Sequence, residues 1–216
     1  MSEKTLGQCR LCGRVFAKSG MARHIPNCRQ RQTPEGKQHS LLLRVQGLHL
    51  PQYWLFLEVS TTATWRDLDT FFRHVWLECC GHLSSFTYLG EEFTDAELDT
   101  WGMERESRSL GGRLANVLIP GGRFRYVYDF GTSTELEGQV LGLPPATGKI
   151  PKIRVLARNN PPEIPCVNCE QPAALINGES WDAVCDNCAS GENEDLLPIV
   201  NSPRTGCCAY VGPSEE

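Results

Sequence analysis

Two groups of closely spaced cysteines restrict what this chain can fold into more than any other feature of its sequence. The groups read Cys9-x2-Cys12-x11-His24-x3-Cys28 and Cys166-x2-Cys169-x15-Cys185-x2-Cys188. Zinc takes four sulfur or nitrogen ligands in a tetrahedron, and a two-residue spacer lets one tight turn present two thiolates. No apolar signal segment is evident at the start, so we expect a cytoplasmic protein, in which metal binding is favoured over disulfides for the 11 cysteines. The sequence therefore predicts two bound zinc ions.

The first group is typical of a small zinc finger in residues 1–30. Phe16 and Met21 stand where a ββα finger keeps its two apolar core residues, and the spacing of His24 and Cys28 places both on one face of a helix. The segment resembles a C2H2 zinc finger in which cysteine replaces the last histidine. Pro26 is expected to interrupt the helix between these two ligands, so a long recognition helix is not predicted.

The charge of this segment makes nucleic acid a candidate partner. Residues 1–40 carry eight basic and two acidic side chains, a net charge of +6, whereas the rest of the chain carries −11. The helix positions that usually read bases fall on Ala17, Gly20 and Arg23, and of these only arginine can donate to a guanine edge. Sequence-specific DNA recognition is therefore not expected, whereas phosphate contact and protein binding both remain open. The candidate nucleic-acid-binding residues are Arg10, Arg14, Lys18 and Arg23.

The second group is typical of a zinc ribbon, here with a C-terminal tail, in residues 163–216. Residues 173–176 and 179–184 are predicted strands joined by a type I′ turn at Asn177 and Gly178. Four thiolates close the coordination sphere, so this zinc is expected to be structural. The acidic character of the segment favours a protein partner over nucleic acid. Its acidic residues are Glu163, Glu170, Glu179, Asp182, Asp186, Glu192, Glu194 and Asp195.

Residues 41–158 are predicted to form an α+β domain, which follows a linker at residues 31–40. Apolar side chains alternate with period two over residues 41–45, 53–59 and 124–130, as in half-buried strands. Between Trp65 and Cys79 they recur every three or four residues, which predicts one main helix with Cys79 on its apolar face. Thr64 and Asp67 form a capping box at its start, and Gly81 supplies its stop. Further strands are expected at residues 85–89 and 150–156, and a short helix at 94–101. The fold class is therefore α+β, with an antiparallel sheet, one main helix and two small flanking zinc modules.

Three sequence segments of this domain carry a family resemblance. They are Trp65-Arg-Asp-Leu-Asp69, Trp76-Leu-Glu-Cys-Cys-Gly-His-Leu-Ser84 with Phe86, and Phe124-x-Tyr-x-Tyr-Asp-Phe-Gly131. With them, residues 40–157 resemble the plasmid Ri open-reading-frame-three-like family, also met as an insertion-sequence passenger protein. The resemblance implies a small α+β domain of bacteria, archaea and mobile elements, and it brings no established reaction. The tail at 201–210 resembles one found after some bacterial zinc ribbons, where Cys-Gly-Tyr is usual. Cys208 matches the cysteine of that motif, and Ala209 stands in place of its glycine.

Cys79, Cys80, Cys207 and Cys208 lie outside both groups. Burial is the first interpretation of Cys79, whereas Cys80 and His82 would form a third metal or reactive site if Cys207 or Cys208 folded back towards them. The sequence contains no phosphate-binding loop, dinucleotide fingerprint, nucleophile elbow or His-Glu-x-x-His motif. The first functional hypothesis is therefore a non-enzymatic zinc-binding adaptor.

The alternative is an enzyme whose pocket lies near Cys80, His82, Tyr128 and Asp129. The two hypotheses differ in whether these four side chains should converge on one cleft.

Overall fold

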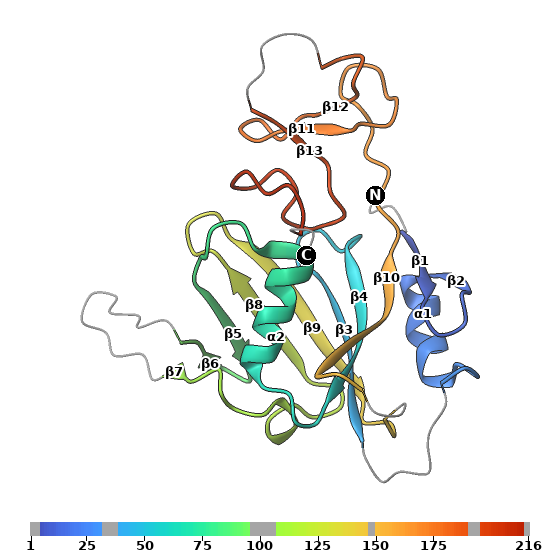
Figure 1. Cartoon of the computed structure of the whole chain (residues 1–216), viewed down its shortest axis with the longest axis vertical. Helices are drawn as coiled ribbons and strands as arrows, with labels where there is room; N and C mark the ends of the chain where they lie inside the picture. The colour runs from blue at the N-terminus through green and yellow to red at the C-terminus, as the bar shows by residue number, and fades with distance from the viewer. Residues whose placement is uncertain (1–4, 32–38, 96–106, 147–149, 190–194, 214–216) are drawn as a thin grey trace.

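The protein is a mixed α+β structure, which confirms the fold class expected from the sequence (Figure 1). The computed structural model describes residues 5–31, 39–95, 107–146, 150–189 and 195–213. Within them, ten strands form one sheet in the order β2-β1-β10-β4-β3-β9-β8-β5-β6-β7, antiparallel except for the pair β6 and β7. These strands are β1 (Leu6–Cys9), β2 (Val15–Ala17), β3 (Ser40–Gly47), β4 (Trp54–Ser60), β5 (Ser84–Tyr88), β6 (Glu91–Phe93), β7 (Ser107–Arg108), β8 (Arg123–Tyr128), β9 (Thr134–Gly142) and β10 (Ile153–Asn159).

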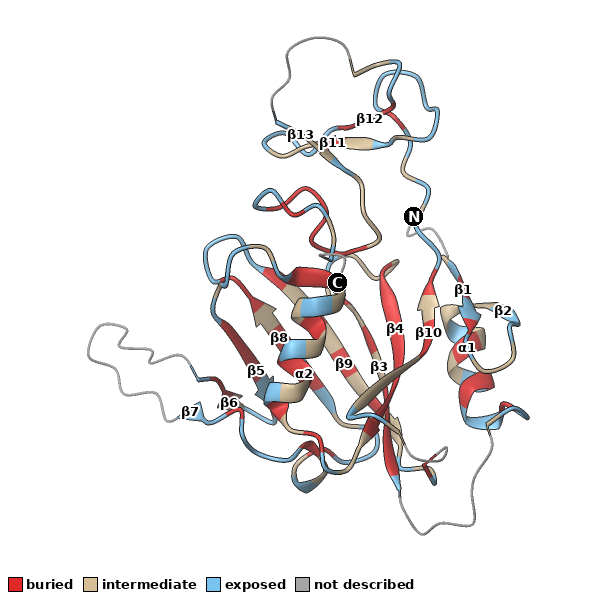
Figure 2. Ribbon diagram, viewed as in Figure 1, coloured by how far each residue is buried: buried red, intermediate tan, exposed pale blue. Residues whose placement is uncertain are grey.

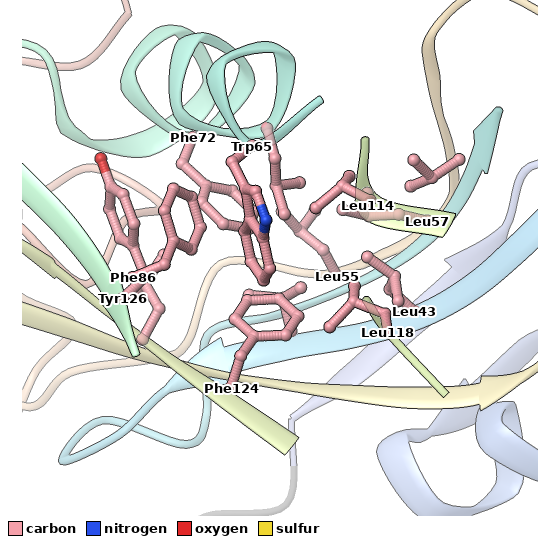
Figure 3. Packing of buried hydrophobic residues seen from close by; sticks show 14 of the residues in the cluster. Leu43, Leu55, Leu57, Trp65, Phe72, Phe86, Leu114, Leu118, Phe124 and Tyr126 are labelled. Atoms are coloured by element: carbon pink, nitrogen blue, oxygen red, sulfur yellow. The ribbon is translucent and has the colours of Figure 1, made fainter. Parts of the chain in front are cut away.

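The hairpin of β3 and β4 forms the centre of the sheet, and both of its faces are covered. Leu43 pairs with Leu57, and the side chains on their face pack under the helix α2 (Trp65–Phe72). Aromatic residues of α2, β5 and β8 fill this core: Trp65, Phe72, Phe86, Phe124 and Tyr126 lie together in Figure 3. Figure 2 accordingly shows the central strands as mostly buried. The alternation read from the sequence thus corresponds to two opposite covered faces.

The main helix starts where the sequence predicts and ends earlier. Thr64 Oγ1 accepts a hydrogen bond from the Asp67 backbone N–H at 3.2 Å, and Asp67 Oδ2 accepts one from the Thr64 N–H at 2.8 Å, which completes the capping box. After Phe72 the helix widens into one π-helical turn, η2 (Arg73–Leu77), and then stops. The prediction that Cys79 lies on the helix face was therefore wrong, because this residue belongs to the connection that follows the helix.

The N-terminal finger is continuous with the sheet. It consists of β1, β2, the short helix α1 (Lys18–His24) and a 3-10 turn, η1 (Ile25–Asn27), which contains Pro26 as the sequence suggested. Strand β1 pairs with β10, with Gly7 opposite Asn159 and Cys9 opposite Ala157. A second core joins the two parts, because the finger packs on the outer face of the central strands. This core contains Cys9, Met21, Ile25, Cys28, Leu42, Trp54, Phe56, Leu156 and Ala157.

The ribbon projects from the end of the sheet between β10 and the C-terminal tail (Figure 1). It contains β11 (Leu175–Asn177), β12 (Ala183–Val184) and β13 (Leu196–Pro198), in the order β12-β11-β13. The predicted type I′ turn was wrong, because the connection between β11 and β12 runs from Gly178 to Asp182. Asn177 Oδ1 accepts hydrogen bonds from the backbone N–H groups of Glu179 and Ser180, each at 2.8 Å, and this side-chain turn replaces the two-residue hairpin turn.

Two further expectations concern segments that the structure describes only in part. Residues 32–38 of the predicted linker and residues 96–101 of the predicted acidic helix lie outside the described residues. Four small elements were not anticipated: the strands β6, β7 and β13, and a 3-10 turn, η3 (Leu114–Asn116), which packs Leu114 under α2.

Candidate metal centres

The finger brings its four predicted ligands together. One ligand atom each from Cys9, Cys12, His24 and Cys28 lies within 4.8 Å of the other three. Cys9 ends β1, Cys12 stands in the tight turn that follows, His24 ends α1 and Cys28 follows η1. Cys12 Sγ is 3.3 Å from His24 Nε2. A sulfur and a nitrogen bound to one tetrahedral zinc are about 3.5 Å apart, so this arrangement fits the ion.

Local electrostatics prepare two of these ligands for a metal. The backbone N–H of Arg14 is the main cause that lowers the pKa of Cys12 to about 7, whereas burial raises the pKa of Cys9 to about 11. Burial, together with the Arg14 guanidinium 3.1 Å from Nδ1, lowers the pKa of His24. A thiolate at Cys12 and a neutral imidazole at His24 are the forms that bind zinc.

The ribbon forms a second group from two facing knuckles. The sulfurs of Cys166, Cys169, Cys185 and Cys188 all lie within 4.8 Å of one another. Cys169 Sγ and Cys185 Sγ are 3.6 Å apart, close to the separation of about 3.8 Å for two sulfurs on one tetrahedral zinc. A backbone hydrogen bond from Cys185 is the main cause that lowers the pKa of Cys166 to about 6, whereas contact with Cys169 raises that of Cys188 to about 12. Crowded thiols oppose each other's ionisation, and a bound dication relieves that opposition.

The described residues contain a third group of this kind, one more than the two sites expected. It consists of Cys79, Cys80, His82 and Cys208, whose ligand atoms again lie within 4.8 Å of one another. Sequence reasoning left open whether Cys207 or Cys208 would fold back, and the structure brings Cys208 to the group while Cys207 is buried elsewhere. Each of the three Cys/His groups can hold a metal ion.

The four side chains of the enzyme hypothesis lie close together. His82 Nε2 is 2.9 Å from Cys80 Sγ and 3.4 Å from Asp129 Oδ2. Tyr128 donates a hydrogen bond to Glu78 Oε1 at 3.1 Å, and its hydroxyl is thereby occupied. Beside them, a cavity of about 570 Å³ is lined by the end of α2, η2, Cys79 and the tail, and by none of these four residues.

Asp129 has structural partners of its own. Its carboxylate accepts hydrogen bonds from Arg204 at 2.8 Å and from the backbone N–H groups of Gly131 and Thr132. Burial raises the pKa of Asp129, but these hydrogen bonds outweigh it and hold that pKa below its usual range. The carboxylate therefore stays ionised as part of the hairpin between β8 and β9.

The four candidate nucleic-acid-binding residues divide into two pairs. Arg10 and Arg23 are exposed, and Arg14 is exposed as well but has contacts within the finger. Arg14 lies against His24 and over the Phe16 ring, 5.4 Å from its centroid. Lys18 is half-buried and donates hydrogen bonds to Gln46 Oε1 at 2.7 Å and to a backbone carbonyl at 2.8 Å. Two of the four positive charges are thus engaged within the protein.

Comparisons with known proteins identify no family for this chain. No family model matches the chain, and no curated protein matches it. Among solved structures, it is similar to MM3350, a protein of unknown function from Methanosarcina mazei Go1. The two are 19% identical with a TM-score of 0.49, over 58% of this chain and 72% of that one. Among the described residues, no helix combines the length and the apolar character needed to cross a bilayer.

Proposed function

We propose that this protein is a zinc-binding adaptor of the cytoplasm, without catalytic activity, whose ribbon contacts a protein partner that has a basic surface. One observation carries the proposal: the finger and the ribbon each supply four ligand atoms within 4.8 Å of one another. Four protein ligands close the coordination sphere of zinc and leave no position for water or substrate. The zinc ions then stabilise two small modules that have little core of their own.

The charge of the ribbon favours a basic protein surface as its target. The sequence contains no lysine or arginine between Arg158 and Arg204. Six of the ribbon's acidic side chains are described and exposed: Glu163, Glu170, Glu179, Asp182, Asp186 and Asp195. Val167 and Trp181 of the same module are 58% and 48% exposed and offer apolar contacts. Figure 2 shows the ribbon as largely exposed and projecting from the sheet.

Nucleic-acid contact at the finger is the second candidate function. Its support is the exposure of Arg10, Arg23 and Arg29 on one small module. Arg14 is exposed too, but its contacts with His24 and Phe16, and the hydrogen bonds of half-buried Lys18, reduce this support. The enzyme alternative has less, because Tyr128 and Asp129 are held by internal hydrogen bonds.

We also propose that residues 40–157 belong to a known family. The segments at 65–69, 76–86 and 124–131 support membership in the plasmid Ri open-reading-frame-three-like family, with its association with mobile elements.

The adaptor proposal is tested by charge reversal on the ribbon. Tagged full-length protein and its Glu170→Lys/Asp186→Lys variant are used to capture proteins from the cells that express them, and recovery is measured by quantitative mass spectrometry. A Glu91→Lys/Glu92→Lys variant changes the charge equally on the sheet and serves as the control. We expect proteins with basic surfaces to be lost only from the ribbon variant, and to be released by added salt. Equal recovery with all three proteins contradicts the proposal.

The nucleic-acid alternative is measured in parallel. Fluorescence anisotropy with a short DNA duplex and a single-stranded RNA reports binding by the full chain and by Arg10→Glu/Arg23→Glu. Binding that falls steeply with salt and is lost in this variant would assign the finger to nucleic acid.

A further inference from the structure

The third Cys/His group joins parts of the chain that are far apart in sequence. Cys79, Cys80 and His82 follow the end of α2, whereas Cys208 lies in the C-terminal tail. Cys80 Sγ is 3.5 Å from Cys208 Sγ, 3.5 Å from Cys79 Sγ and 2.9 Å from His82 Nε2, and His82 Nε2 is 3.4 Å from Cys208 Sγ. Ligands of one tetrahedral zinc are separated by about 3.5–3.8 Å. We propose that these four residues bind a third zinc ion, which fastens the tail to the body of the protein.

The donor set supports zinc. Three sulfurs and one imidazole nitrogen also make up the group in the finger, so the chain uses the same ligands twice. Arg204, which is paired with Asp129, also donates a hydrogen bond to Cys79 Sγ at 3.5 Å and so supports this ligand from outside the ligand set.

The connection after α2 is built to present its ligands outwards. The Gly81 backbone N–H donates to Glu78 Oε1 at 2.6 Å, and Gly81 has a φ of 76°, a conformation that favours glycine. Arg73 donates to the backbone carbonyl of His82 at 2.7 Å and fixes this end of the turn. Cys80, between these anchors, is exposed.

The tail is anchored on both sides of the proposed ligand. Ser202 donates a hydrogen bond to the backbone carbonyl of Trp76 at 2.6 Å, and Arg204 is fully buried. Tyr210, two residues beyond Cys208, is buried as well. Cys208 itself is exposed and has a φ of 47°, so its neighbours hold it in position at the surface.

A zinc ion here would also fix the position of the ribbon, which is inserted between β10 and the tail. The two stems of the ribbon meet at Asn159 and Asn201, where Asn159 Nδ2 donates to Asn201 Oδ1 at 2.7 Å and Asn201 Nδ2 donates to the Asn159 carbonyl at 2.9 Å. The zinc would add a second attachment, between the tail that follows the ribbon and the body of the protein. Its four ligands close the coordination sphere, so the site is structural whichever partner the ribbon contacts.

The test counts zinc in the full chain. Protein purified under reducing conditions without added metal is analysed by elemental analysis and native mass spectrometry. We expect three zinc ions per unmodified chain and two in Cys208→Ser. The control Cys207→Ala should keep three, because the Cys207 thiol is buried and lies outside the group. Three ions in Cys208→Ser, or two in the unmodified chain, would overturn the proposal.

A second measurement uses the unmodified protein, so its result does not depend on whether a variant folds. The unmodified protein is treated with N-ethylmaleimide before and after EDTA, and labelled cysteines are identified by peptide mass spectrometry. Cys80 and Cys208 are exposed, so as free thiols both are accessible to the reagent. We expect both to resist until zinc is removed. Immediate labelling of either residue, or a Cys80–Cys208 disulfide in the reduced preparation, would overturn the proposal.

Discussion

Replacing Arg204 by methionine is expected to destabilise the protein by about 3–5 kcal/mol, the range for removing one partner of a buried ion pair. The Arg204 side chain is fully buried and donates to Asp129 Oδ2 at 2.8 Å, to the Thr132 carbonyl at 3.1 Å and to Thr134 Oγ1 at 3.0 Å. Its guanidinium also lies 4.8 Å from the centroid of the Tyr128 ring. Methionine fills much of the same space but leaves the Asp129 carboxylate, only 6% exposed, without a cation.

A double-mutant cycle with Asp129→Asn isolates the ion pair. The asparagine can still accept from the backbone N–H groups of the hairpin, so the double variant removes both charges and leaves none buried alone. We expect a coupling energy of about 1.5–3 kcal/mol, measured by urea unfolding at constant zinc and reductant. Arg66→Met is the control, because Arg66 is 61% exposed in its ion pair with Asp95 and is expected to lose less than about 1 kcal/mol. A loss for Arg204→Met no larger than for this control, or a coupling energy near zero, would refute the reasoning.

Three further substitutions test local features by urea unfolding. Ala209 has a φ of 53°, a conformation that favours glycine, so Ala209→Gly is expected to stabilise the protein by about 0.5–1 kcal/mol. A loss of stability would contradict backbone strain at this position. A Cβ at Gly138 would lie 2.0 Å from the Phe124 ring, so Gly138→Ala is expected to destabilise by about 1–3 kcal/mol, whereas the control Gly111→Ala, with space around it, should change stability by less than about 1 kcal/mol. Burial raises the pKa of Asp67, but hydrogen bonds from Thr64 bring that pKa below its usual value. The ionised carboxylate therefore stabilises the folded state at pH values above the unfolded pKa of about 3.9, and this stabilisation is lost as the pH falls. Asp67→Asn should therefore cost about 0.5–1 kcal/mol at pH 7 and nothing near pH 2, and a difference that persists in acid would argue against this origin.

Local patterns were sufficient for elements whose causes lie close together in the sequence. Thr64 and Asp67 are three residues apart and mark the helix start, and the period of two over residues 41–45 and 53–59 identifies the central hairpin. The two groups of closely spaced cysteines are likewise local, and their ligand atoms do come together.

Features that depend on distant partners could not be read in this way. No local signal shows that β1 pairs with β10, because an edge strand carries no mark of its neighbour. The apolar repeat continued past Leu77 and gave no sign of the π-helical turn that ends the helix before Cys79. The turn after Asn177 is formed by its side chain, which accepts a hydrogen bond from the Glu179 backbone N–H. The Asn-Gly pair at this position indicated a two-residue hairpin turn instead.

One part of the third Cys/His group could be predicted from the sequence and the other could not. Cys80 and His82 are two residues apart and are visible as a pair of ligand types. Cys208 is 128 residues beyond Cys80, and the anchoring of the tail by Ser202, Arg204 and Tyr210 brings it back to the body of the protein.

The central claim is that zinc is bound only by protein sulfur and nitrogen in closed, four-coordinate sites. X-ray absorption spectroscopy at the zinc edge of the full chain tests it directly. With three ions bound as the groups imply, ten sulfurs and two imidazole nitrogens share the twelve ligand positions, so we expect a dominant sulfur shell at about 2.3 Å and a minor nitrogen shell at about 2.0–2.1 Å. A light-atom shell as large as the sulfur shell would reveal water or carboxylate on the metal, and would contradict a structural role for these sites.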